Sequence, residues 1–153
     1  VVAPSSTLKP LLGREFFMTK NASKLLIKDT STNTYLIMYR ANHPHFGDAI
    51  DLPGGTVEAG ETAVQATIRE VIEEAQIDTS HYDYEQLYDG TKYSRFLTRY
   101  TLYTAQVQQQ PEVTLSWEHK AYAWLPKDEI VKQCRASNDK FMYMVADQLE
   151  KML

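Results

Sequence analysis

Apolar positions along the chain change their spacing several times, which indicates a mixture of strands and helices. Strands are expected at 13–20, 24–28, 34–40, 50–52 and 121–125, with two or three more within 82–107, broken near Asp89-Gly90. The polar segment 29–33 separates two of these apolar runs and favours a β-hairpin. Helices are expected at 62–75, 127–133 and 138–151. This alternation predicts an α/β fold.

The expected helix over 62–75 has an acidic face. Thr62 and Gln65 have the spacing of a capping box, which satisfies free amide groups where a helix begins. At about 100° per residue, Glu73 and Glu74 lie within about 60° of Glu70, so three carboxylates share one face. We expect the opposite face to pack on the core; it carries Val64, Ile68, Val71, Ile72 and Ala75.

Two interpretations of this acidic face stay open from the spacing alone. A run of charges on a helix is usually a solvated surface, and like charges four residues apart destabilise the helix slightly. The alternative is a site for a hard divalent cation, which prefers carboxylate and carbonyl oxygens. The glycine-rich turn Pro53-Gly54-Gly55 just upstream favours the cation site, because it offers a backbone carbonyl near the acids.

The segment from Gly55 to Ile77 resembles the Nudix box. The residues that match the family pattern at the right spacing are Gly55, Glu61, Arg69, Glu70, Val71, Glu73, Glu74 and Ile77. One position departs from the pattern: Gln76 stands where the family has a second glycine. That glycine ends the helix in a left-handed conformation, so we expect a distorted helix end here rather than lost metal binding.

The resemblance to the Nudix hydrolases extends beyond the box. It covers roughly 25–130, including Arg40, the approach Leu52-Pro53-Gly54-Gly55, and the segment 117–125 with its Glu-containing loop and Trp-Leu strand. It implies an α/β/α sandwich with a mixed β-sheet between helices. We expect the whole chain, 1–153, to form one such domain, as its length also suggests.

The resemblance also implies a reaction and its cofactor. Nudix hydrolases cleave a nucleoside diphosphate linked to another group, with Mg²⁺ or Mn²⁺ assisting attack by water. By match to the family, Glu70, Glu73 and Glu74 are the expected metal ligands, together with the backbone carbonyl of Gly54. Glu70 is also a candidate base, and Arg69 is expected to pair with Glu61.

Further candidate site residues lie outside the helix. Glu118 is the candidate distal carboxylate, acting as base or as an extra metal ligand. Arg40 is a candidate phosphate contact because a guanidinium can bind phosphate with two hydrogen bonds. Gly54 and Gly55 are expected to line the substrate site. We interpret the three histidines near the site as structural or loop polar groups: His43, His45 and His119.

Composition and charge exclude several classes of protein. Sixteen Lys and Arg against 20 Asp and Glu give a net charge of −4, which argues against nucleic acid or an anionic membrane as a partner. One cysteine, Cys134, excludes an internal disulfide and fits a reducing compartment. No apolar run has the length of a membrane span, and the first residues do not resemble a signal peptide. We therefore expect a cytoplasmic protein.

The expected substrate is a nucleotide or another molecule linked to a nucleoside diphosphate. A compact chain of this kind favours a MutT-like nucleoside triphosphate pyrophosphohydrolase. The first alternative is a dinucleoside polyphosphate hydrolase, favoured by Tyr93, which lies about 16 residues after the box where ADP-ribose hydrolases often carry Pro. A second alternative is a non-catalytic nucleotide-binding module. An RNA-cap hydrolase and an isopentenyl-diphosphate isomerase are disfavoured, and a homodimer would be compatible with the family.

Overall fold

The computed structural model describes residues 20–94 and 97–152. Its strands are β1 (Asn21–Asp29), β2 (Thr34–Arg40), β3 (Ile50–Asp51), β4 (Gly54–Thr56), β5 (Glu85–Gly90), β6 (Arg99–Val107) and β7 (His119–Leu125). Its helices are α2 (Ala63–Ala75), α3 (Lys127–Arg135) and α4 (Lys140–Lys151). Of the predicted strand over 13–20, all but Lys20 lies outside the described residues, and Lys20 precedes β1. The other predicted strands and helices are present with ends shifted by a few residues.

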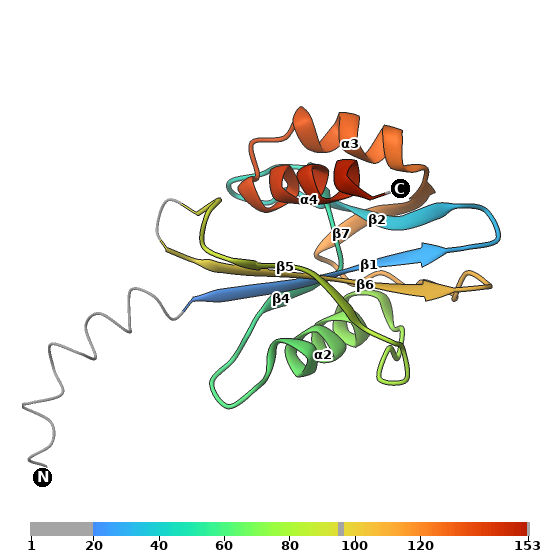
Figure 1. Ribbon diagram of the computed structural model, residues 1–153, viewed down its shortest axis with the longest axis horizontal. Helices are drawn as coiled ribbons and strands as arrows, with labels where there is room; N and C mark the ends of the chain where they lie inside the picture. Colours follow the sequence, from blue (N-terminus) through green and yellow to red (C-terminus); the bar gives the residue numbers. More distant parts are fainter. Residues whose placement is uncertain (1–19, 95–96, 153) are drawn as a thin grey trace, which may run out of the picture.

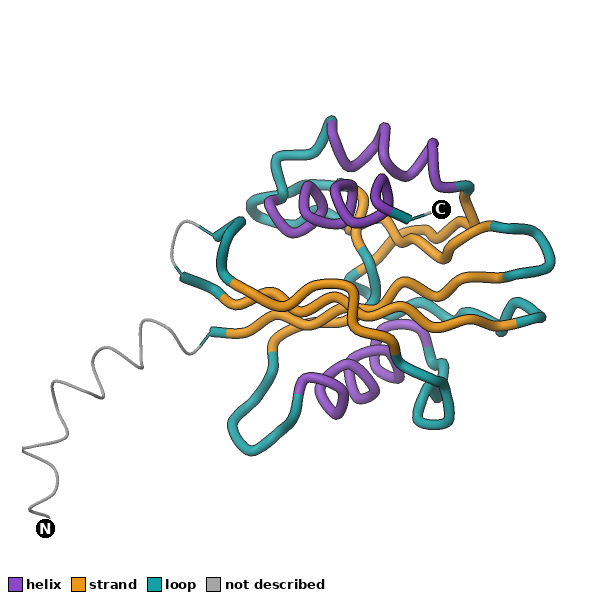
Figure 2. Tube along the Cα trace, in the orientation of Figure 1, coloured by secondary structure: helices purple, strands orange, loops and turns teal. Residues whose placement is uncertain are grey.

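The elements form three layers. Helix α2 lies below the sheet in Figure 1, and α3 and α4 lie above it; the tube in Figure 2 shows the same arrangement. Ser23 of β1 and Thr67 of α2 join the lower two layers, because their hydroxyl oxygens lie 2.6 Å apart. The predicted α/β/α sandwich is therefore confirmed. Among the described residues, no helix is both long and apolar enough to span a bilayer.

Strand β1 organises the sheet. On one edge it pairs with β6 in parallel along its full length, from Asn21↔Arg99 to Asp29↔Val107. On the other edge its first half pairs with β4, and its last residues pair with β2 through Lys28↔Tyr35. Both of these pairings are antiparallel, so the sheet is mixed, as predicted, and the hairpin around 29–33 is confirmed. Strands β4 and β2 pair with different parts of the same edge of β1. They therefore diverge from each other and leave room for a site between them.

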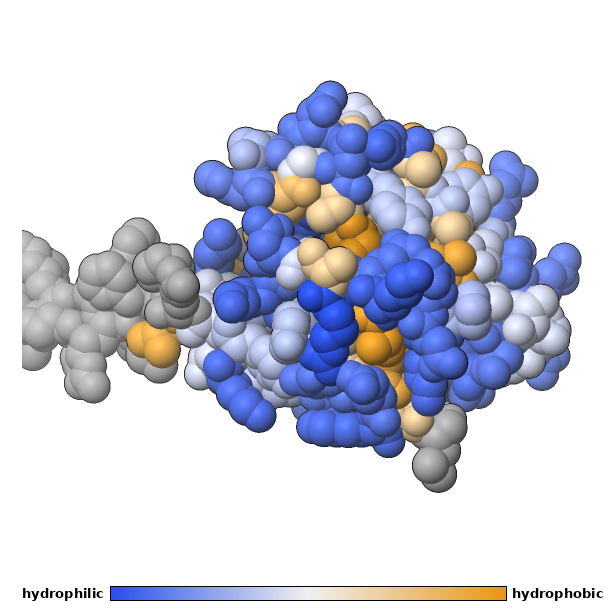
Figure 3. Space-filling view, turned by 90° about the horizontal axis from the view of Figure 1, so that it is seen from above, coloured by the Kyte–Doolittle hydropathy of each residue, from blue (hydrophilic) through white to orange (hydrophobic). Residues whose placement is uncertain are grey.

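Apolar residues of β1 alternate between two cores. Leu26 packs above the sheet with Ile130 of α3 and Met144 of α4. Leu25 and Ile27 pack below it with Val71 of α2 and its neighbours. A strand covered on both faces requires a continuous apolar run rather than alternation, which explains the sequence Leu25-Leu26-Ile27. The outer face over α3 and α4 is mostly hydrophilic, with hydrophobic residues visible in narrow gaps (Figure 3).

Helix α2 begins and ends with defined caps. The capping box is confirmed: Thr62 Oγ1 accepts a hydrogen bond from Gln65 N–H, and the Gln65 side chain accepts one from Thr62 N–H. Gln76 is the C-cap and adopts a left-handed conformation, with φ 56° and ψ 38°. Its N–H still donates to Ile72 O at 3.0 Å. The predicted distortion is therefore absent, and Gln76 takes the backbone conformation of the family's glycine.

Candidate active site

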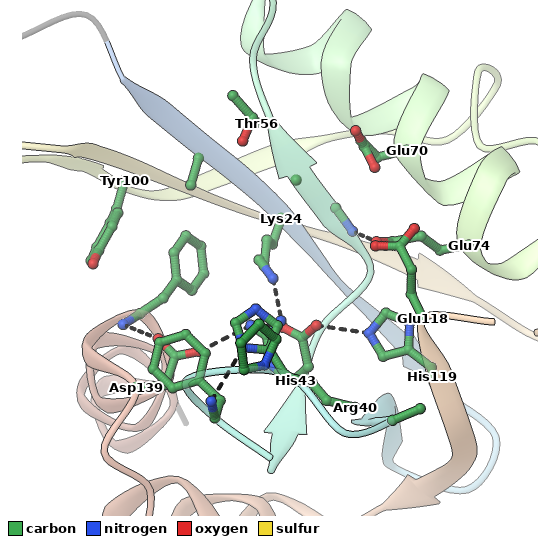
Figure 4. A pocket seen from close by; sticks show the side chains of 18 of the residues that line it. Lys24, Arg40, His43, Thr56, Glu70, Glu74, Tyr100, Glu118, His119 and Asp139 are labelled. Carbon is green, nitrogen blue, oxygen red and sulfur yellow. Dashed lines mark hydrogen bonds and ion pairs between the residues drawn. The ribbon is translucent and has the colours of Figure 1, made fainter. Parts of the chain in front are cut away.

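A cavity of about 630 Å³ lies between α2 and α4, where β2 and β4 diverge. Its walls include carboxylates from the α2 side, the guanidinium of Arg40 and the glycines of β4. In Figure 4, Glu70, Glu74 and Glu118 lie on one side of the cavity, and Tyr100 and Asp139 lie on the other. The cavity therefore brings together most of the site residues predicted from the sequence: Arg40, Gly54, Gly55, Glu70, Glu74 and Glu118.

Two glycines let β4 lie close to its neighbours, Gly54 to β1 and Gly55 to α2. Gly54 has φ 138°, and a Cβ there would lie 2.3 Å from Ser23 O. A Cβ on Gly55 would lie 2.7 Å from the carboxyl carbon of Glu70. With no side chain in the way, Gly54 N–H donates a hydrogen bond of 2.9 Å to Glu74 Oε1. These residues thus explain why the turn before the helix needs glycine at both positions.

The buried face of α2 agrees with the prediction at Val71 and Ala75 and differs from it at Ile72 and Glu74. Ala66, Thr67, Val71, Glu74 and Ala75 are buried, whereas Ile72, which was expected to face the core, is 44% exposed. The helix is therefore rotated so that part of its acidic face packs toward β4. The contact with Gly54 and Gly55 explains the rotation, because it compensates burial of a carboxylate with a backbone hydrogen bond.

Arg69 holds several of the acids. Its Nε lies 2.8 Å from Glu61 Oε2, so the predicted pair is present, and its Nη1 lies 2.8 Å from Glu70 Oε1. The hydrogen bond from Arg69 lowers the pKa of Glu61 to about 2. Glu73 lies farther away, with Oε2 3.6 Å from Arg69 Nη1 and a side chain 55% exposed, and it does not line the cavity. Arg69 thus fixes the loop before α2 against the acidic face.

Glu74 is a buried carboxylate with little compensation. Burial raises its pKa to about 8. The charge of Lys24 and the hydrogen bond from Gly54 N–H lower the pKa, but they offset the effect of burial only in part. Burial also raises the pKa of Glu70, although Arg69 opposes the change. Glu118 adds further negative charge near both carboxylates. In the part of the chain that the structure describes, Glu74 has no ion-pair partner.

These carboxylates have the chemistry of a hard-cation site without being gathered around one point. Among residues 20–94 and 97–152, no three His, Cys, Asp or Glu side chains are arranged ready to hold a metal ion. Glu70 and Glu73 are turned toward Arg69, and Glu74 toward Gly54. Oxygen donors on one cavity wall, with excess negative charge, still fit Mg²⁺ or Mn²⁺ by donor type. A cation would draw these side chains away from their present partners.

A second group of charges lies at the cavity, and sequence reasoning missed three of its members: Lys24, Asp51 and Asp139. Asp51 is buried and lies 2.5 Å from Lys24 Nζ, 3.3 Å from Arg40 Nη2 and 2.8 Å from His119 Nε2. Arg40 also lies 3.2 Å from Asp139 Oδ2. Although burial opposes ionisation, the charge of Lys24 and the bond from His119 hold the pKa of Asp51 well below its ordinary range. One feature of the sequence could have indicated this group: Lys24 directly precedes the apolar run Leu25-Leu26-Ile27, and a charged residue there needs a partner.

Two residues weighed from the sequence, Tyr93 and His43, make contacts that do not serve the proposed chemistry directly. The Tyr93 hydroxyl donates a hydrogen bond to Asp147 of α4, and Tyr93 does not line the cavity. Burial and this bond raise the pKa of Tyr93 to about 12. His43 lines the cavity, but its Nδ1 accepts hydrogen bonds from the loop amides of His45 and Phe46, as expected for a loop polar group.

Comparison with known proteins agrees with this geometry. The sequence matches the family model of the NUDIX domain over residues 18–145. It is 40% identical over 50 residues to the 8-oxo-dGTP diphosphatase of Escherichia coli K12, a match that spans 33% of this chain and 39% of that protein. The chain thus spans about two fifths of the length of this curated relative.

Solved structures share the fold. A MutT protein from Methanosarcina mazei Go1 superimposes with a TM-score of 0.64 and 20% identity, over 86% of this chain and 90% of that one. A C. elegans Ap4A hydrolase superimposes with a TM-score of 0.65 and 23% identity, over 85% of this chain and 93% of that one. The E. coli dihydroneopterin triphosphate pyrophosphohydrolase superimposes with a TM-score of 0.66 and 22% identity, over 86% of this chain and 93% of that one. Taken with the domain match over most of the chain, these findings show that the chain belongs to the Nudix family.

Proposed function

We propose that this chain hydrolyses the phosphoanhydride of a nucleoside triphosphate, releasing a nucleoside monophosphate and pyrophosphate, with Mg²⁺ or Mn²⁺ as cofactor. The observation that carries the proposal is the meeting of Glu70, Glu74 and Glu118 with Arg40 in one cavity. Carboxylates for a cation beside a fixed guanidinium suit a polyphosphate. The name of the E. coli relative, 8-oxo-dGTP diphosphatase, supports the same class of substrate.

The proposed cation ligands are Glu70, Glu73 and Glu74, with the backbone carbonyl of Gly54. Support comes from Glu74, a buried carboxylate that lacks an ion-pair partner in the described chain, and from the unbalanced charge around it. When bound, a divalent cation would neutralise phosphate oxygens and lower the pKa of an attacking water. Glu70 and Glu73 would turn away from Arg69, which keeps Glu61 as its partner.

The chain's own residues supply the remaining steps. Arg40 would bind a phosphate, since it lines the cavity and a guanidinium can form two hydrogen bonds to phosphate oxygens. Glu118 would accept the proton of the attacking water; its exposed side chain comes from the loop before β7 and faces Glu74 (Figure 4). Gly54 and Gly55 would line the phosphate site, and the absence of a side chain on Gly55 leaves the Glu70 carboxylate in its place beside β4.

The dinucleoside polyphosphate hydrolase stays the second candidate. The fold of the C. elegans Ap4A hydrolase is similar to that of this chain. Tyr93, the residue that favoured this substrate in the sequence, bonds to Asp147 instead of facing the cavity. The triphosphate is therefore preferred. A non-catalytic binding module is the third candidate, and it would not need three repelling carboxylates.

A panel of substrates tests the proposal. Purified protein with Mg²⁺ is incubated with nucleoside triphosphates, dinucleoside polyphosphates and ADP-ribose, and the products are identified by mass. The expected products are a monophosphate and pyrophosphate from a triphosphate. Turnover confined to dinucleotides would favour the second candidate, and binding without turnover would favour the third.

Variants test the assigned roles. Glu73→Gln or Glu74→Gln is expected to abolish metal-dependent turnover in a folded protein. Glu118→Gln is expected to lower kcat by about 100-fold if this residue is the base. Glu112→Gln is the matched control, because Glu112 is an exposed acid on the preceding loop and does not line the cavity. Full turnover in both Glu73→Gln and Glu74→Gln would contradict the cation site.

A further inference from the structure

The mouth of the cavity carries an indole ring that the proposed chemistry does not use. Trp117 lines the cavity and is 86% exposed, more than any other large hydrophobic side chain that the structure describes. Covering a large exposed aromatic surface with a ligand removes it from water, which favours binding of that ligand. Its position next to Glu118 places this surface beside the acidic wall of the cavity.

A second aromatic group stands on the neighbouring loop. His43 and Phe46 both line the cavity, and their rings stack with centroids 5.0 Å apart and planes 26° from parallel. The two loops are joined, because Ala41 N–H donates a hydrogen bond of 3.0 Å to Glu118 O. The mouth of the cavity is thus bordered by rings from two loops that are hydrogen-bonded to each other.

Arg40 connects this aromatic border to the proposed phosphate site. Its guanidinium carbon lies 5.0 Å from the centre of the Phe46 ring, and the same group contacts Asp51 and Asp139. A phosphate bound by Arg40 would therefore lie next to the aromatic border. The group attached to that phosphate would reach the border without crossing the cavity.

The opposite end of the cavity also has aromatic rings, but these already have partners. Tyr100 and Phe141 pack on each other with centroids 4.9 Å apart. Phe141 is 3% exposed and belongs to the core above the sheet. Little of its surface remains for a ligand to cover, in contrast to Trp117.

We propose that Trp117 stacks on the nucleobase of the substrate and is a specificity-determining residue. This inference rests on the proposed function, which supplies the nucleotide substrate. It adds the place where the nucleobase of that nucleotide binds. Stacking on an indole accepts any base, since every base has a π-face. Trp117 would thus contribute affinity for nucleotides over polyphosphates without a base.

Intrinsic fluorescence tests the contact without turnover. The chain has two tryptophans, and the second, Trp124, is partly buried against the core below the sheet. The protein is titrated with α,β-methylene analogues of the four common nucleoside triphosphates and, separately, with inorganic tripolyphosphate. We expect quenching by at least one nucleotide analogue, no quenching by tripolyphosphate, and loss of the quenching in Trp117→Leu. Nucleotide binding by calorimetry without quenching would overturn the inference and leave the proposed function standing.

Kinetics give an independent readout. Trp117→Leu is expected to raise KM for the nucleotide by about 10-fold or more with kcat little changed, and Trp117→Phe to restore most of the loss. Tyr143→Leu is the control, because Tyr143 is 43% exposed on α4 and does not line the cavity. An unchanged KM in folded Trp117→Leu, or a rise in KM caused by Tyr100→Leu instead, would overturn the inference. A protein that binds no nucleotide analogue at all would overturn both proposals.

Discussion

His119 Nε2 and Asp51 Oδ2 form a buried hydrogen bond of 2.8 Å beneath the cavity. Because a carboxylate only accepts hydrogen bonds, the hydrogen of this bond is on Nε2, which leaves Nδ1 as the other ring nitrogen. That Nδ1 is buried and has no hydrogen-bond partner among the described residues. The bond also ties β3 to β7, one residue after Glu118, so it fixes the backbone that carries the candidate base.

Removing the Asp51 charge is expected to destabilise the fold strongly. Asp51→Asn leaves Lys24 and Arg40 partly buried beside a neutral group, and breaking a buried ion pair costs about 3–5 kcal/mol. Urea unfolding measures the loss. Asp48→Asn breaks the exposed Asp48–Lys120 pair and is expected to cost far less stability than Asp51→Asn. Equal, small losses in the two variants would show that the buried charges are not coupled.

Gln76→Gly is expected to stabilise the protein by about 0.5–1 kcal/mol. Gln76 ends α2 with φ 56°, a conformation that glycine adopts without a steric cost. Thermal unfolding of the two proteins measures the difference. Gln76→Ala keeps a Cβ in the same conformation, so it serves as the control and should not stabilise. A gain in Gln76→Ala equal to that in Gln76→Gly would refute the backbone explanation.

Gly55→Ala is expected to impair turnover more than folding. Its Cβ would lie 2.7 Å from the Glu70 carboxyl carbon and 2.9 Å from Oε2, so the carboxylate must move. Displacement of a site group by an ångström can lower kcat/KM by about 100-fold. Gly60→Ala is the control: the φ of Gly60 is 85°, but nothing lies within 4 Å of its Cβ position. We expect Gly60→Ala to lose stability and to retain turnover when folded.

Stability is expected to fall between pH 4 and pH 2 in part because of Asp29. The carboxylate accepts hydrogen bonds from Ser31 and Thr32 in the β1–β2 turn, and the bond from the Ser31 hydroxyl leads in lowering its pKa from 3.8 to about 2. A pKa lower in the folded state gives stability that is present above pH 4 and lost as the pH falls through 2. Asp29→Asn should flatten this part of the stability profile. An identical slope in the two proteins would contradict the assignment.

Cys134 is expected to be inert to thiol reagents in the folded protein. The side chain is fully buried, and burial raises the pKa of its thiol to about 12, so little thiolate exists at neutral pH. Reaction with a chromogenic disulfide should appear on unfolding. Fast labelling under native conditions would contradict the buried placement.

The sequence alone predicted the class of fold and much of the candidate site, because both depend on local patterns. The Nudix box places Glu70, Glu73 and Glu74 within one helix, and the capping box sets where that helix begins. The core face of α2 was predicted correctly at Val71 and Ala75 and wrongly at Ile72, since helical spacing shows which residues share a face but not how that face is turned against the sheet. The contact of Gly54 with Glu74 decides that orientation, and it joins segments 20 residues apart.

The sequence alone did not predict the contacts between residues that are distant in the chain. Asp51 has partners on three strands, and no local pattern indicates that Lys24, Arg40 and His119 meet there. A charged residue inside an apolar strand signals a buried partner without identifying it. The partner of Tyr93 was not indicated by the sequence for the same reason, because Asp147 lies 54 residues away.

The parallel pairing of β1 with β6 has a consequence for how the molecule folds. Every residue from 30 to 98, including helix α2, lies in the loop that this pairing closes. Contacts between residues so distant in the chain require a large loss of chain entropy before they contribute, and they slow folding. The cavity, which is lined by residues of β1 and by Tyr100 of β6, would thus form late, after α2 already has its caps.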